Sequence, residues 1–582
     1  MKALLLISLM YANCCYCQLQ GTSQSFKITD QQVHVIDSLI GAAYPDNEPG
    51  AAVLLAQDGK ILLRKGYGMA SMELQIPAGP NHVFGIGTLS LYFTAVAIVI
   101  LQEQGRLDVK DDVRKYLPNY DTHGKTITIE NLLTHTSGIP GFREYVAYSV
   151  KDKLEESRYA GLQFSEEQPL LFDPGTNWSY SLTGYGLLAL IVEKISVQSF
   201  NGFLQQQIFD KLGMTQTYPG KKGVIPLKTT GYLFNAARKE YERYDEGTYV
   251  QYSAVGIGSI MSTVDDLYRW HKGLRDETLI SRASLKKAWT SHILPNGMDV
   301  HYGYGRTINR IDGNLFVGHG GVMPNYLSDE WQMPEHDIYF VILSNQRKNA
   351  RTPPLIANRV AALITGLDPT PSAKKPSLDK LKKLTGIYQT EATGTRLQKN
   401  YTKEGVVQLD IFTENNKLFI KRIGTNKAEL LAFDDSTWCL ASDPFSRYIF
   451  RKALSGNITG FITTGLFTQS GPPRFAKKIA SDWPAPPSIL LIDSTRLKAY
   501  TGIFQQPGGT RQKLMVENNK LVLTDEDELD KKELSYIGDH TFFNFSTEIK
   551  YKFIADKSGK IVEINYFDGV WNIVAKRIRD NY

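Results

Sequence analysis

The sequence predicts an α+β domain, in which helices pack on an antiparallel sheet, followed by two small antiparallel β modules. Strand-like segments lie at both ends of the first 366 residues, with apolar helices between them. A Pro- and Lys-rich linker follows, and beyond it short strands and polar turns form an internal repeat. We therefore divide the chain into a signal peptide (1–17), the α+β domain (26–366), the linker (367–380) and two β modules (381–480 and 494–582).

The first residues are typical of an export signal. Met1 and Lys2 give a positive start, residues 3–12 are an apolar run, and cleavage is expected after the small-residue pattern that ends at Cys17. The apolar run is too short for a comfortable membrane span. An uncleaved anchor and a lipid-anchored cysteine remain alternatives. We expect an exported protein, periplasmic or secreted, whose mature chain has no transmembrane helix.

Composition excludes several classes of partner. The net charge is only +6 over 582 residues and no dense Lys/Arg run occurs, so nucleic acid is not an expected partner. The ten histidines show no metal-ligand spacing and no Gly-rich phosphate loop is present, so we expect neither metal nor cofactor. Signal cleavage would leave Cys439 as the only cysteine, a structural one. The sequence leaves the oligomeric state open.

Several elements of the α+β domain can be placed in order. Asp58-Gly59 between two apolar runs predicts a β-hairpin. Residues 89–104 are apolar without Pro or Gly, which predicts a central helix. Residues 262–266 resemble a capping box and predict a helix through Trp270. The other expected elements are a helix from near Ser181 to Ser196 and strands at 314–317 and 338–343.

The region after the linker contains an internal repeat. Three segments recur in the same order: 384–389 as 500–505, 414–418 as 517–521, and 475–479 as 574–578. Three ordered matches predict two copies of one antiparallel module, each a compact barrel. Neither copy gathers catalytic residue types, so a structural or substrate-edge role is expected for both.

Residues 84–95 read FGIGTLSLYFTA, a segment that resembles a known catalytic motif. In the serine β-lactamase and penicillin-binding protein family the nucleophile segment reads F-x-I-G-S-x-[ST]-K-x-F-T-A, and its Ser and Lys do the chemistry. Here Thr88 stands at the Ser position and Leu91 at the Lys position. Residues 126–140 match a further signature of this family.

The two other catalytic segments of the family follow in the expected order. Residues 173–185 match the segment that normally contains Y-S-N, which here reads Tyr180-Ser181-Leu182. Residues 318–321 match the H-x-G segment of the esterase-like branches. The resemblance covers about residues 26–365 and is closest to class C β-lactamases, D-aminopeptidases and esterases. It implies a β-lactamase-like serine hydrolase domain, and the β modules resemble the lipocalin-like domains that often follow such domains.

The resemblance also implies what each position should do. In the family, the Lys and a Tyr remove the proton of the serine hydroxyl, the Asn binds the Lys and the substrate amide, and two backbone amides hold the oxyanion. Thr88 keeps a hydroxyl that its methyl group crowds, whereas Leu91 offers no base and Leu182 no amide. Retained positions are Tyr180, His319 and Gly321, and by analogy the oxyanion donors are the amides of Thr88 and Val322.

Some readings of these residues are purely structural. We expect Thr88 to be a helix N-cap, and we expect Leu91 and Leu182 to touch each other, because replacing two contacting polar groups together avoids an unpaired one. Ser90 lies two positions off the nucleophile, and His135 is expected to be a hydrogen-bonded structural histidine. Three further S-x-x-K matches are ascribed to chance: 284–287, 372–375 and 377–380.

The leading hypothesis is an exported homologue of serine hydrolases that is weakly active or inactive. Its cleft would bind a small peptide-like or ester molecule, including cell-wall-derived ones. Two alternatives stay open: a functional esterase, D-aminopeptidase or carboxypeptidase that uses Thr88 with Tyr180 or His319 as base, and a non-enzymatic scaffold that binds a partner protein.

Overall fold

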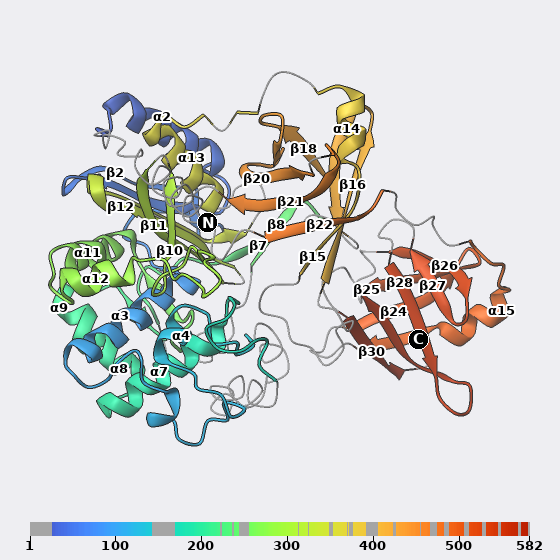
Figure 1. The fold of residues 1–582 in the computed structure, drawn as a ribbon, viewed down its shortest axis with the longest axis horizontal. Helices are drawn as coiled ribbons and strands as arrows, with labels where there is room; N and C mark the ends of the chain where they lie inside the picture. Colours follow the sequence, from blue (N-terminus) through green and yellow to red (C-terminus); the bar gives the residue numbers. More distant parts are fainter. Residues whose placement is uncertain are drawn as a thin grey trace, which may run out of the picture.

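The computed structural model describes most of the chain from residue 26 onward, so the predicted signal peptide lies outside the described residues (Figure 1). The described ranges are 26–141, 169–220, 224–235, 238–243, 255–311, 313–323, 325–347, 353–368, 370–371, 376–391, 406–422, 427–453, 455–465, 474–481, 488–505, 511–525, 531–544, 549–567 and 572–579. They form one α+β domain and two β-barrels, as the sequence predicts.

The α+β domain is built on a six-stranded antiparallel sheet with strand order β10-β11-β12-β13-β1-β2. Its strands are β1 (Ala51–Gln57), β2 (Lys60–Tyr67), β10 (Thr307–Ile311), β11 (Asn314–Val322), β12 (Leu327–Met333) and β13 (Ile338–Ser344). The hairpin between β1 and β2 turns at Asp58 and Gly59, whose φ angles are 52° and 74°. Positive φ at both residues suits a tight turn that matches the strand twist. The predicted hairpin and both predicted C-terminal strands are therefore confirmed.

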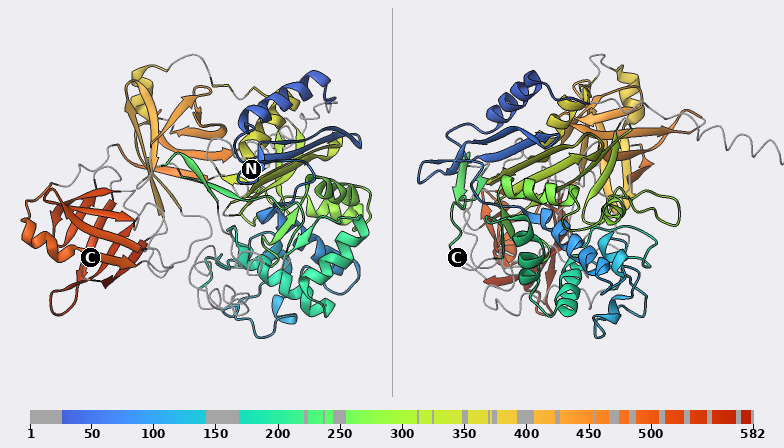
Figure 2. Two further views of the ribbon diagram at one scale, coloured as in Figure 1. Left: turned by 180° about the vertical axis from the view of Figure 1, so that it is seen from behind. Right: turned by 90° about the vertical axis from the view of Figure 1, so that its left-hand side faces the viewer.

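Helices cover both faces of this sheet (Figure 2). On β1, Ala51, Val53 and Leu55 pack toward α2 (Asp30–Ala43) and α13 (Pro353–Thr365). The alternate residues, Ala52, Leu54 and Ala56, pack toward the helical layer with α3 (Ser90–Glu103), α7 (Leu182–Ser196) and α11 (Val264–Arg275). Burial on both faces explains why β1 and β13 are almost continuous apolar runs rather than alternating ones.

Helix α3 lies at the centre of the helical layer, as its apolar sequence predicts. Every residue from Ser90 to Leu101 is buried, which is the pattern of a helix that is surrounded by other elements. Helix α7 begins after its N-cap Ser181, whose side chain accepts from the backbone N–H of Gly184. Both helices match their predicted bounds to within a residue or two.

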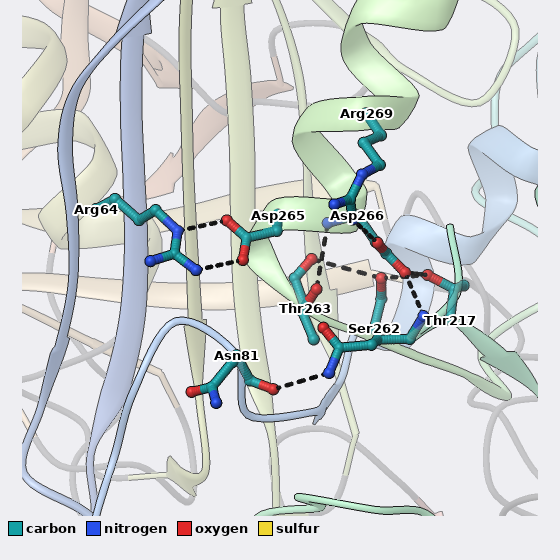
Figure 3. Close-up of polar contacts among 9 residues, drawn as sticks. Arg64, Asn81, Thr217, Ser262, Thr263, Asp265, Asp266 and Arg269 are labelled. Carbon is teal, nitrogen blue, oxygen red and sulfur yellow. Dashed lines mark hydrogen bonds and ion pairs between the residues drawn. The ribbon is translucent and has the colours of Figure 1, made fainter. Parts of the chain in front are cut away.

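The capping box predicted for α11 forms only in part (Figure 3). Thr263 caps the helix and accepts from the backbone N–H of Asp266. The Asp266 carboxylate does not return to the cap. Instead it accepts from the Thr217 hydroxyl and the Gln216 backbone N–H, each at 2.8 Å, and pairs with Arg269. The network ties the start of α11 to the loop that holds Thr217.

Two closed eight-stranded barrels follow the α+β domain. The first contains β15 (Gly386–Glu391), β16 (Val406–Glu414), β17 (Lys417–Arg422), β18 (Ala428–Ala432), β19 (Thr437–Leu440), β20 (Asp443–Lys452), β21 (Ile458–Gly465) and β22 (Arg474–Ala480). The second contains β23 (Gly502–Gln505), β24 (Arg511–Glu517), β25 (Lys520–Asp525), β26 (Lys532–Gly538), β27 (Thr541–Asn544), β28 (Ile549–Ala555), β29 (Ile561–Phe567) and β30 (Asn572–Arg579).

The sequence repeat marks equivalent positions in the two barrels. Gly386 and Gly502 open their barrels with φ angles of 141° and 143°, a conformation that side chains rarely adopt. The repeated Asn pairs at 415–416 and 518–519 have positive φ and turn the second hairpin of each barrel. A short helix precedes each barrel and packs apolar side chains into its core: α14 (Leu378–Leu384) in the first, and α15 (Ser494–Leu497) with η6 (Lys498–Tyr500) in the second.

The first barrel packs against the α+β domain. Phe445 of β20 is 1% exposed and belongs to the apolar cluster of the sheet, together with Phe316 and Trp331. Figures 1 and 2 show this barrel beside the sheet and the second barrel farther away. Phe445 therefore anchors the first barrel near the β10–β11 hairpin.

Shorter elements complete the described part of the α+β domain. They are β3 (Met69–Ser71), β4 (Ile76–Pro77), β5 (Phe84–Gly85), β6 (Tyr218–Pro219), β7 (Tyr232–Asn235), β8 (Glu240–Arg243), β9 (Ile260–Ser262), β14 (Gln346–Arg347), α4 (Ile129–Leu133), α8 (Phe200–Leu204), α9 (Asp210–Leu212), α12 (Arg282–Ala288), η1 (Gly87–Leu89), η2 (Val113–Lys115), η3 (Gln205–Phe209) and η4 (Pro334–His336). Within the described residues no single helix meets the length and hydropathy of a bilayer span, although the bent pair Leu182–Ser196 and Phe200–Leu212 does so jointly.

Candidate active site

The segment that carries Thr88 is held in place by strand pairing before it becomes a helix. Strand β5 pairs with β9, and the backbone N–H of Ile86 donates to the Ile260 carbonyl at 3.1 Å. Strand β9 leads into α11, whose polar network includes a 2.8 Å contact between the Ser262 and Thr217 hydroxyls (Figure 3). The chain then turns through η1 into α3. The network at α11 thus fixes the strand against which the Thr88 segment is registered.

Glycines bring η1 and β11 together, backbone against backbone. A Cβ on Gly87 would lie 2.6 Å from the Val322 nitrogen, and one on Gly321 would lie 2.0 Å from the Ile86 carbonyl oxygen. Neither position can hold a side chain without moving the main chain. The Ser328 hydroxyl also donates to the Ile86 carbonyl at 2.8 Å. These contacts place the backbones of Thr88 and Val322 next to each other.

The edge of β11 is open where it meets η1. Strand β10 pairs with β11 only as far as Gly318, so residues 319–322 extend beyond their neighbour on that side. The Gly320 carbonyl points away from β12 and accepts the Thr88 hydroxyl at 3.0 Å. At the end of this edge, Val322 has an exposed side chain.

The prediction that Thr88 caps the central helix is wrong. A 3₁₀ turn, Gly87–Leu89, precedes α3, so the cap position falls on Leu89 and no side chain accepts from the first turn. The Thr88 side chain is instead used for the contact with Gly320. Its hydroxyl proton therefore points at a backbone carbonyl, which accepts a hydrogen bond but is no base near neutral pH.

Leu91 and Leu182 belong to the same hydrophobic cluster. Leu91 is fully buried, and Leu182, the first residue of α7, lies at the partly buried margin of that cluster. The site thus has apolar side chains where the family chemistry requires an amine and an amide. Direct contact between the two leucines stays a prediction.

His319 is buried and neutral. Its Nδ1 bonds to the Gly320 carbonyl, and its Nε2 lies 3.1 Å from the Tyr302 hydroxyl. A carbonyl only accepts, so Nδ1 carries the proton and Nε2 accepts from Tyr302. Burial is the main cause that lowers the pKa of His319, the Gly320 bond raises it and the nearby charge of Arg306 lowers it, and together they bring it to about 4. In this tautomer Nδ1 of His319 carries a proton and has no free lone pair, so it cannot take the proton of the Thr88 hydroxyl.

Tyr180 lies over a closely packed group of aromatic rings. Its ring centroid is 4.3 Å from that of His135 and 6.2 Å from that of His319. His135 is buried, and its Nδ1 accepts from the backbone N–H of Ser181 at 3.1 Å, which confirms its structural role. Burial keeps the pKa of His135 well below its ordinary value. Tyr180 and His319 thus lie in one group of rings, and His319 and Thr88 share the Gly320 carbonyl.

Sequence reasoning missed Tyr302 and three buried ionisable residues near the sheet. Tyr302 bonds to Nε2 of His319, while Arg306, Asp329 and Glu330 place buried ionisable groups in or beside the strands of the sheet. Both carboxyl oxygens of Asp329 lack a hydrogen-bond partner, and burial raises its pKa well above the ordinary value. The adjacent Asp329 and Glu330, directly before Trp331, were the available signal, because carboxylates are rarely buried without a reason.

The other candidates from the sequence do not form a second site. The Ser90 hydroxyl is buried without a partner. Lys287 of the 284–287 match pairs with Glu130 at 3.1 Å, and in the 377–380 match Ser377 caps α14 while Lys380 pairs with Asp435. The 372–375 match lies outside the described residues. Cys439 is buried, which raises the pKa of its thiol. Among the described residues, no group of three His, Cys, Asp or Glu is arranged to hold a metal ion.

Comparison with known proteins places this site in context. The family model described as Beta-lactamase matches residues 40–363. Penicillin-binding protein 4* of Bacillus subtilis (strain 168) is 29% identical over 402 residues, which cover 67% of this chain and 87% of that protein. Two solved structures share the fold. The octameric penicillin-binding protein homologue from Pyrococcus abyssi covers 77% of this chain and 99% of its own (TM-score 0.53, 24% identity). The D-amino acid amidase from Ochrobactrum anthropi SV3, complexed with L-phenylalanine amide, covers 58% and 99% (TM-score 0.50, 21% identity).

Proposed function

Because this chain belongs to the beta-lactamase family of serine hydrolase relatives, we propose that it is a pseudo-hydrolase, which binds peptide-like or ester ligands at the family's site with little or no turnover. The proposal extends to ligands derived from the cell wall. The names of its relatives, a penicillin-binding protein and a D-amino acid amidase, favour acyl compounds with D-amino acid character as the first ligands to try.

One observation carries the loss of turnover: the hydroxyl at the nucleophile position donates its proton to a backbone carbonyl, which is no base. The Thr88 hydroxyl donates to the Gly320 carbonyl, and the position one helical turn later is the buried Leu91. A hydroxyl does not ionise near neutral pH, so acyl transfer requires a group that takes its proton. Altering the nucleophile or base of a concerted set costs about 10⁴ to 10⁶ in rate. The two losses overlap, because both remove the same step.

The remaining geometry supports ligand binding rather than chemistry. The close packing of the Gly87 backbone against that of Val322 holds together the two segments whose amides, by family analogy, are the oxyanion donors. Backbone donors need no particular side chain, so they survive the substitutions at 88, 91 and 182. Oxyanion stabilisation alone is worth a residual rate of about 10³ to 10⁴ over water. We expect an acyl ligand to bind with its carbonyl oxygen at these amides.

Binding and turnover can be tested separately on the full chain. Thermal stabilisation is measured with amides and methyl esters of D- and L-phenylalanine, and covalent reaction is followed by mass spectrometry with a fluorescent penicillin. The proposal expects a concentration-dependent rise in Tm without an adduct. The matched control is Gly87→Val, whose side chain would press into the Val322 backbone and should abolish the rise in Tm.

Two outcomes would replace this proposal with one of its alternatives. A covalent adduct on Thr88 that is absent in Thr88→Ala would establish a working hydrolase. Absence of any ligand effect, both in the natural chain and in the Thr88→Ser/Leu91→Lys/Leu182→Asn variant, would favour the scaffold that binds a partner protein. Recovery of ester hydrolysis in that triple variant is the expected result, because it returns the hydroxyl, the base and the amide to a preserved frame.

We also propose that the protein is exported and works in the periplasm or outside the cell, without a transmembrane helix in the mature chain. The positive start and apolar run before Gln18 support this. Fractionation of producing cells, with mass spectrometry of the purified chain, tests it. A mature N-terminus at Gln18 is expected, and a cytoplasmic chain that keeps Met1 would contradict it.

A further inference from the structure

A buried ion pair lies directly beside His319. The Arg306 guanidinium donates to both oxygens of the Glu330 carboxylate, at 2.9 and 3.0 Å. Both side chains are almost fully enclosed, with 2% and 3% of their area exposed. A bidentate pair of this kind fixes the direction of both groups as well as their distance.

Strand register places this pair at the site. His319 of β11 and Glu330 of β12 are directly opposite each other. Residues that face each other in an antiparallel pair project to the same side of the sheet, with Cβ atoms about 4.5–5.5 Å apart. The carboxylate of Glu330 therefore starts from the same surface as the imidazole of His319.

Arg306 is held from a second side by the central helix. Its guanidinium lies over the ring of Tyr92, 4.1 Å from the ring centroid, and the Tyr92 hydroxyl accepts from the indole N–H of Trp289 at 2.9 Å. Tyr92 follows Leu91 on α3. The ion pair thus joins the helix with the altered catalytic position to the strands with His319.

Such a pair is a costly way to fill a core. Burying two charges costs several kcal/mol of desolvation, and apolar residues of similar volume often stabilise a fold equally well or better. We propose that Arg306 is a positioning residue: by binding both oxygens of Glu330 it withholds this carboxylate from His319, so that the imidazole stays uncharged, with its Nδ1–H on the Gly320 carbonyl and its Nε2 accepting from Tyr302. The proposal relies on the proposed function only where it counts His319 as part of the ligand site.

The physical reason lies in which charges face the imidazole. The titratable groups around it are the phenols of Tyr302 and Tyr180, the imidazole of His135, and the ion pair. Both oxygens of Glu330 are committed to Arg306, so no free carboxylate is available to an imidazolium. A proton on Nε2 would also set the Nε2–H donor against the O–H donor of Tyr302, so the phenol would have to turn its proton away. Paired Arg306 therefore leaves the neutral form as the favoured one.

Arg306→Met provides the discriminating variant. Without its partner, the buried Glu330 carboxylate becomes free to bind a protonated His319. An opposite charge within about 4–6 Å shifts a pKa by about 1–3 units, so we expect the pKa of His319 to rise from about 4 to between about 5 and 7. The double variant Arg306→Met/Glu330→Leu removes both charges, and its His319 should stay neutral at pH 7.

The readout is the imidazole itself. NMR titration of protein labelled with ¹⁵N and ¹³C histidine reports charge and tautomer, and His319→Gln identifies the signal. If Arg306→Met does not fold, Arg306→Lys serves, because a lysine ammonium leaves one Glu330 oxygen free and should raise the His319 pKa part of the way. A folded Arg306 variant whose His319 has the same pKa as in the natural chain, or a double variant whose His319 pKa rises as far as that of Arg306→Met, overturns the proposal. Neither result depends on whether any ligand binds.

Discussion

Leu91→Lys is expected to destabilise the protein strongly at pH 7, and Leu182→Asn is expected to return part of that loss. Leu91 has no exposed area, so an ammonium placed there would be stripped of water. The side chain instead loses its proton on folding. Leu182→Asn brings an amide oxygen to the margin of the same cluster, where it could accept from the amine if the two positions touch.

The magnitude follows from the cost of neutralising the lysine. Removing a proton from a group of pKa about 10.4 at pH 7 costs about 4.6 kcal/mol, at 1.36 kcal/mol for each pH unit. The lysine stem recovers most of the apolar contact of Leu91, so we expect a total loss of about 5 kcal/mol. A hydrogen bond between the buried amine and the amide introduced by Leu182→Asn should recover about 1–3 kcal/mol. The unfolded chain binds the extra proton between pH 7 and 10, so the variant should gain stability relative to the natural chain as pH rises through that range.

Urea unfolding of the natural chain, both single variants and the double variant closes a double-mutant cycle. Leu182→Ala with Leu91→Lys is the matched control, because alanine lacks the amide. A coupling energy below about 0.5 kcal/mol would refute the idea that the side chains at positions 91 and 182 contact each other. A destabilisation that does not change between pH 7 and 10 would show that the lysine stays charged, and would refute burial as the cause.

Three further predictions concern other parts of the molecule. The pKa of His319 is about 4 in the folded chain and about 6.5 in the unfolded chain. The unfolded chain therefore takes up the proton first as pH falls, and about 3 kcal/mol of stability should be lost between pH 6.5 and 4. Urea melts of His319→Gln should lack this pH dependence of stability, and an unchanged dependence would contradict the assignment. Asp329 has a raised pKa, so folding holds its carboxyl protonated and stability should fall as pH rises above about 4. The Asp329→Asn variant should therefore be more stable than the natural chain by about 1–3 kcal/mol at pH 7 and equally stable at pH 3. An equal gain in stability at both pH values would exclude ionisation of Asp329 as the cause. Phe445→Ala should cost about 3 kcal/mol of stability and make the first barrel unfold separately from the α+β domain, as a distinct calorimetric transition. The control Phe475→Ala, at a residue that is 48% exposed, should change stability by less than about 0.5 kcal/mol. Equal effects of the two substitutions would argue against Phe445 as an anchor.

Local sequence predicted those elements whose signals are local. The Asp58-Gly59 turn needs positive φ at two successive residues, and few sequences provide it as readily. Ser181 and Thr263 cap their helices because their side chains compete for the free N–H groups of a first turn. The repeat predicted two equivalent barrels, since the same glycine and asparagine conformations recur in both.

Predictions failed where a distant backbone competed for the same side chain. Thr88 has the residue type of an N-cap, but the Gly320 carbonyl, 232 residues away in sequence, takes its hydroxyl. Asp266 has the spacing of a capping box, but the Thr217 loop takes its carboxylate. For Asp266 the local signal was correct that the carboxylate accepts and could not identify the donors, whereas Thr88, expected to accept as a cap, donates instead.

The sequence by itself determined the family, the order of its three catalytic segments, and the replacement of amine and amide by leucine at 91 and 182, because motif identity is written in residue order. Tertiary structure alone decided the state of the site. Burial and the neighbouring Arg306 set the charge of His319, and strand register placed Glu330 opposite it. The close backbone contacts at Gly87 and Gly321 brought the segment of Val322 to that of Thr88. These properties depend on solvent exclusion and on distances between segments hundreds of residues apart, which only the folded chain defines.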